Sequence, residues 1–221
     1  MSATISAAQH NEPNPKAMYK LSYGLFVCTV RTGDNRFNGC IINTAAQIAS
    51  EPNTISVAVN KANYTCEILK ETGEFNISVL STAASFELFK RFGFQSGRNT
   101  DKFEGFSGYG LAANGLPYIT EGTNAFFSLK VKQQVDLGSH ILFVCEPVFM
   151  TVLSEAASCT YEYYQINIKP KPQPVGTTPE GKTIWRCLIC GYEWEGEELP
   201  DDFICPVCKH PKADFEKIVK S

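Results

Sequence analysis

Two Cys-x-x-Cys pairs near the end of the chain constrain its folding more than any other feature of the sequence. The first pair is Cys187 and Cys190, and the second is Cys205 and Cys208. Each Cys-x-x-Cys turn directs two sulfur atoms at one centre, and two such turns complete a tetrahedron of thiolates that suits Zn²⁺ or iron. A module of less than about 40 residues needs a metal or disulfides in order to fold. The sequence therefore predicts a small metal-dependent domain, and the ligand spacing leaves both zinc and iron open.

A proline-rich stretch separates this module from the rest of the chain. Residues 167–183, NIKPKPQPVGTTPEGKT, contain four prolines, which exclude a helix or a central strand and favour an extended spacer. We therefore predict a front domain over residues 17–166, a linker over 167–183 and the metal domain over 184–221.

The front domain reads as mainly β. Buried strands are predicted over 24–30, 53–60 and 74–80, the last two with apolar residues at every second position. Short helices are predicted over Thr65–Gly73, with Thr65 as N-cap and Gly73 as the C-terminal stop, and over 85–93. Two long strands, over 124–138 and 140–153, are joined near Gly138. Many strands with few short helices predict a β-barrel with helical caps.

Composition excludes several classes of function. The net charge of −3 argues against nucleic-acid binding, which needs a basic surface. The N-terminus lacks a signal-peptide pattern, and no apolar run approaches the roughly 18 residues of a membrane span. We expect a soluble, cytoplasmic protein with no membrane contact.

The five single cysteines, as opposed to the paired four, read as reduced buried thiols. No G-x-G-x-x-G follows a strand, and no Walker loop, H-E-x-x-H or G-x-S-x-G motif is present.

The segment around the paired cysteines resembles rubredoxin. The resemblance is carried by C-x-x-C-G-Y at residues 187–192, by LPDDFICPVC at 199–208 and by Phe215, which closes an aromatic shell with Tyr192, Trp194 and Phe203. It implies one iron held by Cys187, Cys190, Cys205 and Cys208, alternating between the ferric and ferrous states. Two departures are the short segment between the pairs, as in rubrerythrins, and Lys209 in place of the usual glycine.

The front domain resembles the flavin reductase family, which has the FMN-binding split-barrel fold. The matching segments are 37–81, SGRNTDKF at 96–103, GSHILFVCE at 138–146 and TYEYYQINIKPKP at 160–172. Within this family the chain is similar to flavin reductases that carry a C-terminal rubredoxin. The resemblance implies that the FMN site is built at a subunit interface, so we expect a homodimer.

The residues expected to contact FMN come from three segments. Gly39 permits close approach of the backbone, the helix that opens near Tyr64 offers its N-terminus to an anion, and three basic side chains could neutralise the FMN phosphate. The full set is Asn38, Gly39, Cys40, Ile41, Asn43 and Thr44 in the first loop, Asn60, Lys61, Tyr64 and Thr65 in the second, and Ser96, Gly97, Arg98 and Lys102 in the third. A flavin contact and an ordinary turn or solvated lysine remain alternatives for each residue taken alone.

His140 is expected to face the pocket of the cofactor and the nicotinamide, where it would orient the substrate or handle a proton. Ser139 replaces the aspartate that usually precedes this histidine, and a surface-turn histidine is the alternative.

Together the resemblances imply electron transfer from NADH or NADPH through FMN to the iron centre, and then to a redox protein such as a flavodiiron oxygen or nitric oxide reductase. Two alternatives stay open: a plain flavin reductase that releases reduced FMN, and a flavin- or haem-binding split barrel with a structural zinc ribbon.

Overall fold

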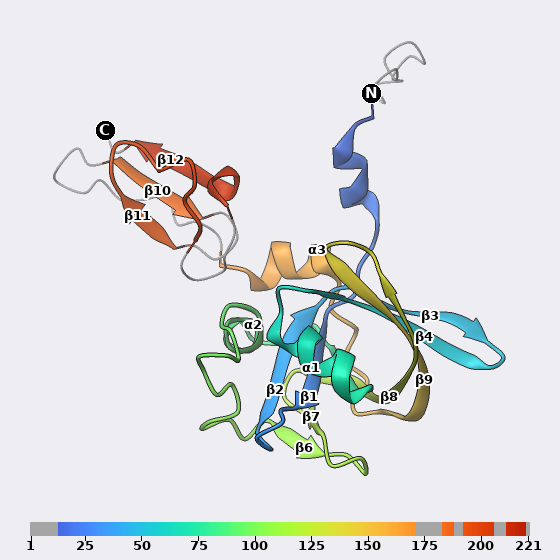
Figure 1. The fold of residues 1–221 in the computed structure, drawn as a ribbon. Helices are drawn as coiled ribbons and strands as arrows, with labels where there is room; N and C mark the ends of the chain where they lie inside the picture. Colours follow the sequence, from blue (N-terminus) through green and yellow to red (C-terminus); the bar gives the residue numbers. More distant parts are fainter. Residues whose placement is uncertain (1–12, 171–182, 188–191, 206–210, 220–221) are drawn as a thin grey trace.

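The computed structural model describes residues 13–170, 183–187, 192–205 and 211–219 (Figure 1). Cys190, Cys208, Pro206, Lys209 and most of the predicted linker lie outside these residues.

The front part is built on one antiparallel sheet of seven strands, in the order β2-β1-β5-β8-β9-β4-β3. Its strands are β1 (Phe26–Arg31), β2 (Phe37–Ile42), β3 (Ala45–Ser50), β4 (Asn53–Asn60), β5 (Glu74–Leu80), β8 (Thr123–Asp136) and β9 (His140–Val152). A separate two-stranded sheet pairs β6 (Tyr109–Leu111) with β7 (Pro117–Ile119). The expectation of a mainly β fold is confirmed.

Helices are few and short. They are α1 (Tyr64–Thr72), α2 (Phe86–Gly93), α3 (Tyr161–Tyr163), which continues as a π-helix over Tyr164–Ile168, and a 3-10 helix over Pro15–Lys20. Helix α1 ends as predicted, because Gly73 adopts φ of 67° and its N–H bonds to the Leu69 carbonyl. The predicted N-cap was wrong: Asn63, two residues earlier, is the N-cap of α1, and Thr65 lies inside the helix.

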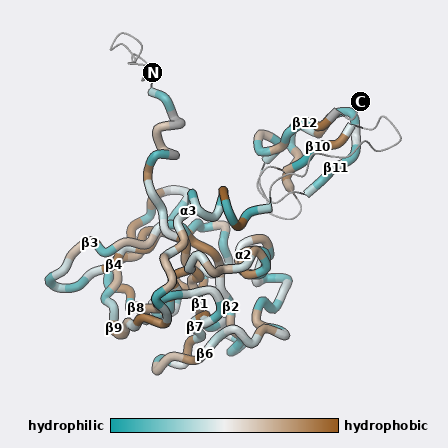
Figure 2. The backbone as a smooth tube through the Cα atoms, turned by 180° about the vertical axis from the view of Figure 1, so that it is seen from behind, coloured by the Kyte–Doolittle hydropathy of each residue, from teal (hydrophilic) through white to brown (hydrophobic). Residues whose placement is uncertain are grey.

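Two hydrophobic clusters fill the front part. One lies among β1, β2, β4, β5, β9 and α1, and includes Val57, Phe75 and Phe143. The other packs α2 against β1 and against the π-helix that follows α3, through residues such as Phe89, Phe92 and Tyr164. Figure 2 shows the hydrophobic stretches within the strands and a hydrophilic tip on the β3–β4 hairpin.

The C-terminal part is a three-stranded sheet in the order β11-β10-β12. Its strands are β10 (Thr183–Cys187), β11 (Glu193–Glu195) and β12 (Phe215–Val219), with a 3-10 turn over Lys212–Asp214. Cys187, Leu199, Cys205 and Phe215 form its buried core.

No helix in the described parts of the chain is long and apolar enough to cross a membrane.

Candidate functional site

Most of the predicted flavin residues gather where strand β2 passes the start of helix α1. Asn38 and Thr65 are both buried, and Asn38 Nδ2 donates a hydrogen bond of 3.0 Å to Thr65 Oγ1. Gly97 lies against the same amide, since a Cβ on it would stand 2.0 Å from Asn38 Oδ1. The structure therefore brings together residues of all three predicted segments.

The prediction of a loop over Asn38–Thr44 was wrong for most of this segment. Asn38, Gly39, Cys40 and Ile41 belong to strand β2 and pair with β1. A Cβ on Gly39 would meet the Cys28 carbonyl oxygen at 2.9 Å and Phe92 at 3.2 Å, so this glycine is needed for strand and helix packing. The sequence NG was read as a turn signal, and pairing with β1 overrides it.

The first turn of α1 is the most suitable place for an anion in this region. Asn63 makes no side-chain hydrogen bond to the helix amides. The Arg98 guanidinium lies 4.8 Å from the centre of the Tyr64 ring and pairs with Glu67 on the same helix. Since free amides and the positive end of the helix dipole favour negative charge, this turn fits a phosphate group.

The other two basic residues are engaged with protein groups. Lys61 Nζ lies 2.6 Å from Asp136 Oδ2, and this hydrogen bond holds the pKa of Asp136 below its usual value. Lys102 was expected at the phosphate, but it is 3% exposed and donates to the carbonyls of Gly39 at 2.8 Å and Phe92 at 3.1 Å. Burial lowers the pKa of Lys102 to about 8. Its ammonium therefore faces protein carbonyls.

Asn43 and Thr44 lie at the other end of β2, in a different setting. They line a cleft of about 870 Å³ together with Met18, Leu21, Tyr161 and Ile166. Met18, Leu21 and Ile166 each expose more than half of their surface there. Sequence reasoning missed these apolar partners, because nothing local in the sequence links residues 18–23 to residues 161–166. The cleft suits a flat, partly apolar ligand.

His140 begins strand β9, opposite Asn60 on β4. The Ser139 hydroxyl lies 2.8 Å from His140 Nδ1. The serine thus contacts the ring nitrogen of its own neighbour, and His140 is half-buried.

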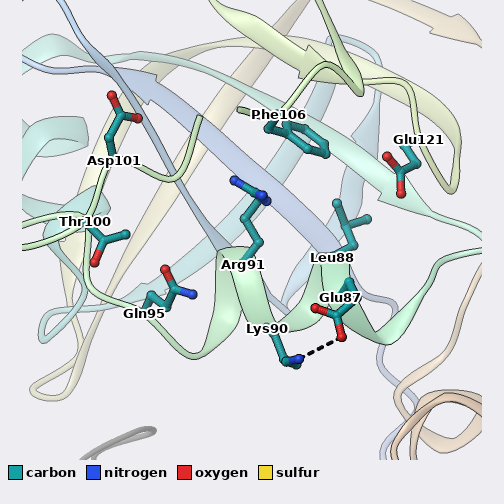
Figure 3. Close-up of a pocket in the computed structure, with 9 residues that line it drawn as sticks. All are labelled: Glu87, Leu88, Lys90, Arg91, Gln95, Thr100, Asp101, Phe106 and Glu121. Atoms are coloured by element: carbon teal, nitrogen blue, oxygen red, sulfur yellow. Dashed lines mark hydrogen bonds and ion pairs between the residues drawn. The ribbon is translucent and has the colours of Figure 1, made fainter. Parts of the chain in front are cut away.

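A second cleft, of about 470 Å³, lies beside helix α2 (Figure 3). Figure 3 shows Leu88 and Arg91 rising from α2 toward Phe106, and an ion pair between Lys90 and Glu87. The Arg91 guanidinium donates to the Lys102 and Glu104 carbonyls at 3.0 and 3.1 Å and lies 5.1 Å from the Phe106 ring centre. These contacts fix the 102–106 segment, and none of the predicted flavin residues lines this cleft.

In the C-terminal part, the two described members of the cysteine tetrad are buried together. Cys187 and Cys205 lie in one cluster, with Trp185, Tyr192, Trp194 and Phe203 packed against it. The rings of Phe203 and Phe215 meet edge to face at 5.4 Å. The predicted aromatic shell is therefore present, and it excludes water from the sulfur atoms. Cys190 and Cys208 lie outside the described residues, so the complete ligand set remains a prediction.

The acidic surface of this part is partly neutralised. Glu193 pairs with Arg186 at 2.6 Å, and Asp201 pairs with Lys212 at 2.7 Å. Exposed carboxylates remain at Glu197, Glu198 and Asp202.

Two family models match the chain in sequence. Residues 18–171 match the flavin reductase like domain, and residues 185–216 match the rubrerythrin, rubredoxin-like domain. The chain is 37% identical to the high molecular weight rubredoxin of Moorella thermoacetica, over 92% of this chain and 99% of that protein. It is also 37% identical to a ferric-chelate reductase (NAD(P)H) of Archaeoglobus fulgidus, over 77% of this chain and 96% of that protein.

Solved structures share the fold of the front part. An FMN-binding protein of Thermus thermophilus aligns with a TM-score of 0.56 at 23% identity, over 69% of this chain and 81% of that chain. An NADH:FAD oxidoreductase of Streptomyces globisporus aligns with a TM-score of 0.59 at 20% identity, over 66% of this chain and 84% of that chain.

Proposed function

The chain belongs to the family of the flavin reductase like domain and continues into a rubredoxin-like domain, and from this premise we propose that it is an NAD(P)H-dependent electron-transfer oxidoreductase. Electrons pass from the nicotinamide through FMN to an Fe(Cys)4 centre and then to a separate redox protein. The observation that carries the proposal is that the two domains are joined in one chain. The Moorella thermoacetica relative, which is 37% identical, aligns with 92% of this chain.

The two groups of predicted flavin residues suit the two ends of one FMN molecule. They lie at opposite ends of β2, from Asn38 to Asn43, which is about 17 Å at the usual rise of a strand. The α1 turn with Arg98 would hold the phosphate, and the cleft with Asn43 and Thr44 would hold the ring. The absence of a side-chain cap on α1 favours the phosphate end, and the exposed apolar lining favours the ring end.

Iron is the metal we propose for Cys187, Cys190, Cys205 and Cys208. The buried sulfur atoms of Cys187 and Cys205 and the aromatic residues around them support a water-excluded thiolate site. Such surroundings exclude solvent from an iron centre and tune its potential.

When bound, FMN would accept the hydride of NAD(P)H as an electron pair and release electrons singly, which a one-iron centre requires. The residues of this chain hold and orient the reactants. We propose that His140, with Ser139 on its Nδ1, presents Nε2 toward the nicotinamide. The linker keeps the iron domain at high effective concentration near the flavin domain.

A second copy of the chain is the partner we propose for the outer face of β9 and β3. Met150 and Val152 lie two positions apart on β9, on the same side of the strand, and both are exposed. Met150 lines an apolar cleft of about 430 Å³ together with Ala45 of β3. Monomeric proteins rarely leave such a contiguous apolar surface in water.

Metal and flavin analysis followed by an anaerobic NADH titration tests this function. We expect one flavin and one iron per chain, with both visible spectra bleaching as NADH is added. A Cys205→Ser variant should keep the bleaching of the flavin and lose that of the iron, and a Cys159→Ser variant should keep both. Zinc in place of iron, in protein from iron-rich culture, would support the zinc-ribbon alternative. Full electron delivery to the acceptor by Cys205→Ser, through released flavin, would support the plain flavin reductase.

A further inference from the structure

Cys28 and Cys40 face each other across the β1–β2 ladder. They are 0% and 5% exposed. Opposite residues of an antiparallel pair have Cα atoms about 4.5–5.5 Å apart, which lies within the roughly 4.4–6.8 Å that a disulfide spans. The pair is held by a short connection, since Thr32 N–H bonds to the Arg36 carbonyl at 2.8 Å to close the hairpin. The backbone therefore already has a separation that permits a bond between the two sulfur atoms.

The surroundings of Cys40 differ from those of an ordinary buried thiol. The ammonium of Lys102 bonds to the carbonyl of Gly39, which precedes Cys40, and the buried Thr65 hydroxyl is also near. A hydrogen bond from Cys28, together with Thr65 and Lys102, lowers the pKa of Cys40. The hydrogen bond with Cys40, and then burial, raises the pKa of Cys28. Cys40 is therefore the thiol that ionises, and Cys28 is the partner beside it.

Other buried thiols of the barrel are less reactive. Burial raises the pKa of Cys66, and it raises the pKa of Cys145 to about 12. Cys159 belongs to the other hydrophobic cluster, and burial raises its pKa to about 11. Lys70 and Lys61 act on Cys66, but burial outweighs them, and no lysine contributes to the shift at Cys145 or Cys159.

We propose that Cys28 and Cys40 form an oxidative modification site, at which hydrogen peroxide converts the two thiols into an intramolecular disulfide. The Cys40 thiolate attacks one peroxide oxygen, the O–O bond breaks, and the other oxygen leaves as hydroxide, so that Cys40 becomes a sulfenic acid. The Cys28 sulfur then attacks the Cys40 sulfur, and the sulfenic oxygen leaves as water with the thiol proton. Two thiols and one peroxide thus give one disulfide and two waters.

Peroxide is the oxidant that this position fits. Cys40 is 5% exposed as a residue, so its oxidant must be a molecule little larger than water, whereas a bulky disulfide would need the barrel to open. The proposal goes beyond the proposed electron transfer and does not rest on it, because both thiols belong to the barrel wall and need no bound flavin.

Peptide mapping of the full-length protein tests the site. Trypsin cleaves after Arg31 and Arg36, so Cys28 falls on peptide 21–31 and Cys40 on peptide 37–61. After peroxide treatment, alkylation under denaturing conditions and digestion without reductant, we expect these peptides as a linked pair lighter by two hydrogen atoms. Reduction should separate them. Complete alkylation of both cysteines, or a link from Cys40 to peptide 62–70, which holds Cys66, would overturn the proposal.

Variants order the two steps. Cys28→Ser should stop at a Cys40 sulfenic acid, labelled by dimedone on peptide 37–61, and Cys40→Ser should give neither label nor link. Cys159→Ser is the matched buried control and should keep the linked pair. Dimedone on Cys28 in the Cys40→Ser variant would contradict the assigned nucleophile. If a variant fails to fold, the mapping of the wild-type protein still decides whether the disulfide forms.

Discussion

At the scale of single residues, one buried ammonium joins strand β2 to the end of helix α2. Lys102 donates to the Gly39 carbonyl and to the Phe92 carbonyl in the last turn of α2. Among the described residues, its Nζ forms no ion pair with a carboxylate. Burial of a charge without a counterion costs free energy, and the two hydrogen bonds offset part of that cost.

Stability should therefore depend on the protonation of Lys102. The pKa of Lys102 is lowered from 10.5 to about 8, so between these values the unfolded chain binds more protons and stability rises with pH. Compared with Lys102→Met, the wild-type free energy of unfolding should rise by up to about 3 kcal/mol as the pH passes from about 8 to 10.5. Urea unfolding of both proteins across this range measures the difference, and parallel curves would contradict the prediction.

Gly97 is the second residue whose role depends on a single contact. A methyl group at this position would overlap Asn38 Oδ1, so Gly97→Ala should displace Asn38 or the 96–98 segment and cost about 1–3 kcal/mol of stability. Flavin affinity, measured by fluorescence titration, should fall with it. Gly33→Ala is the matched control, because no atom lies within 4 Å of its added Cβ. Equal behaviour of the two variants would count against the contact.

At the scale of elements, the spacing of apolar residues along the sequence predicted most of the strands of the central sheet. The prediction over Asn53–Asn60 is confirmed as β4, and those over 74–80, 85–93, 124–138 and 140–153 are confirmed as β5, α2, β8 and β9 to within a few residues. Strands β2 and β3 were missed. Asn38-Gly39 reads locally as a turn, and the apolar partner that holds it extended is β1, across the hairpin.

The site shows the same limit of local reasoning. The sequence placed Asn38, Thr65 and Gly97 in one site through family resemblance, and the structure brings them into contact. It did not place Lys102 inside, because nothing in SGRNTDKF distinguishes an inward lysine from a solvated one. It also missed Met18 and Ile166, which meet only through tertiary packing.

Helix α1 supplies a prediction of its own. Thr65→Val removes the acceptor of the Asn38 amide and leaves a buried donor without a partner, which should cost about 1–3 kcal/mol and weaken flavin binding. Thr72→Val at the exposed end of the same helix should change stability by only about 0.5 kcal/mol. Denaturant unfolding of both variants is the measurement. A Thr65→Val protein as stable as Thr72→Val would show that the buried bond contributes little.

At the scale of the whole molecule, the apolar face of β9 determines the expected assembly. We expect the protein to sediment as a homodimer, and Met150→Asp to weaken the dimer at least about tenfold, because a charge would be buried at its interface. Met150 is 53% exposed, and Leu111 on β6 is 59% exposed outside this face, so Leu111→Asp is the control. Sedimentation of the wild type as a monomer at micromolar concentration would contradict the assignment.

The remaining whole-molecule expectations stay predictions. They are the cytoplasmic location, the choice between NADH and NADPH, and a flavodiiron or similar acceptor. Each depends on contacts with other molecules, which leave no periodicity or ligand spacing in this sequence.

The ion pairs of Glu193 with Arg186 and of Asp201 with Lys212 have a consequence for the kinetics of encounter. Long-range attraction depends on the charge that a surface presents to the solvent, and these two carboxylates are largely cancelled at close range. The electrostatic attraction of a positively charged acceptor to this domain should therefore be weaker than the number of its acidic residues implies. Added salt should slow the collision of the two proteins only modestly.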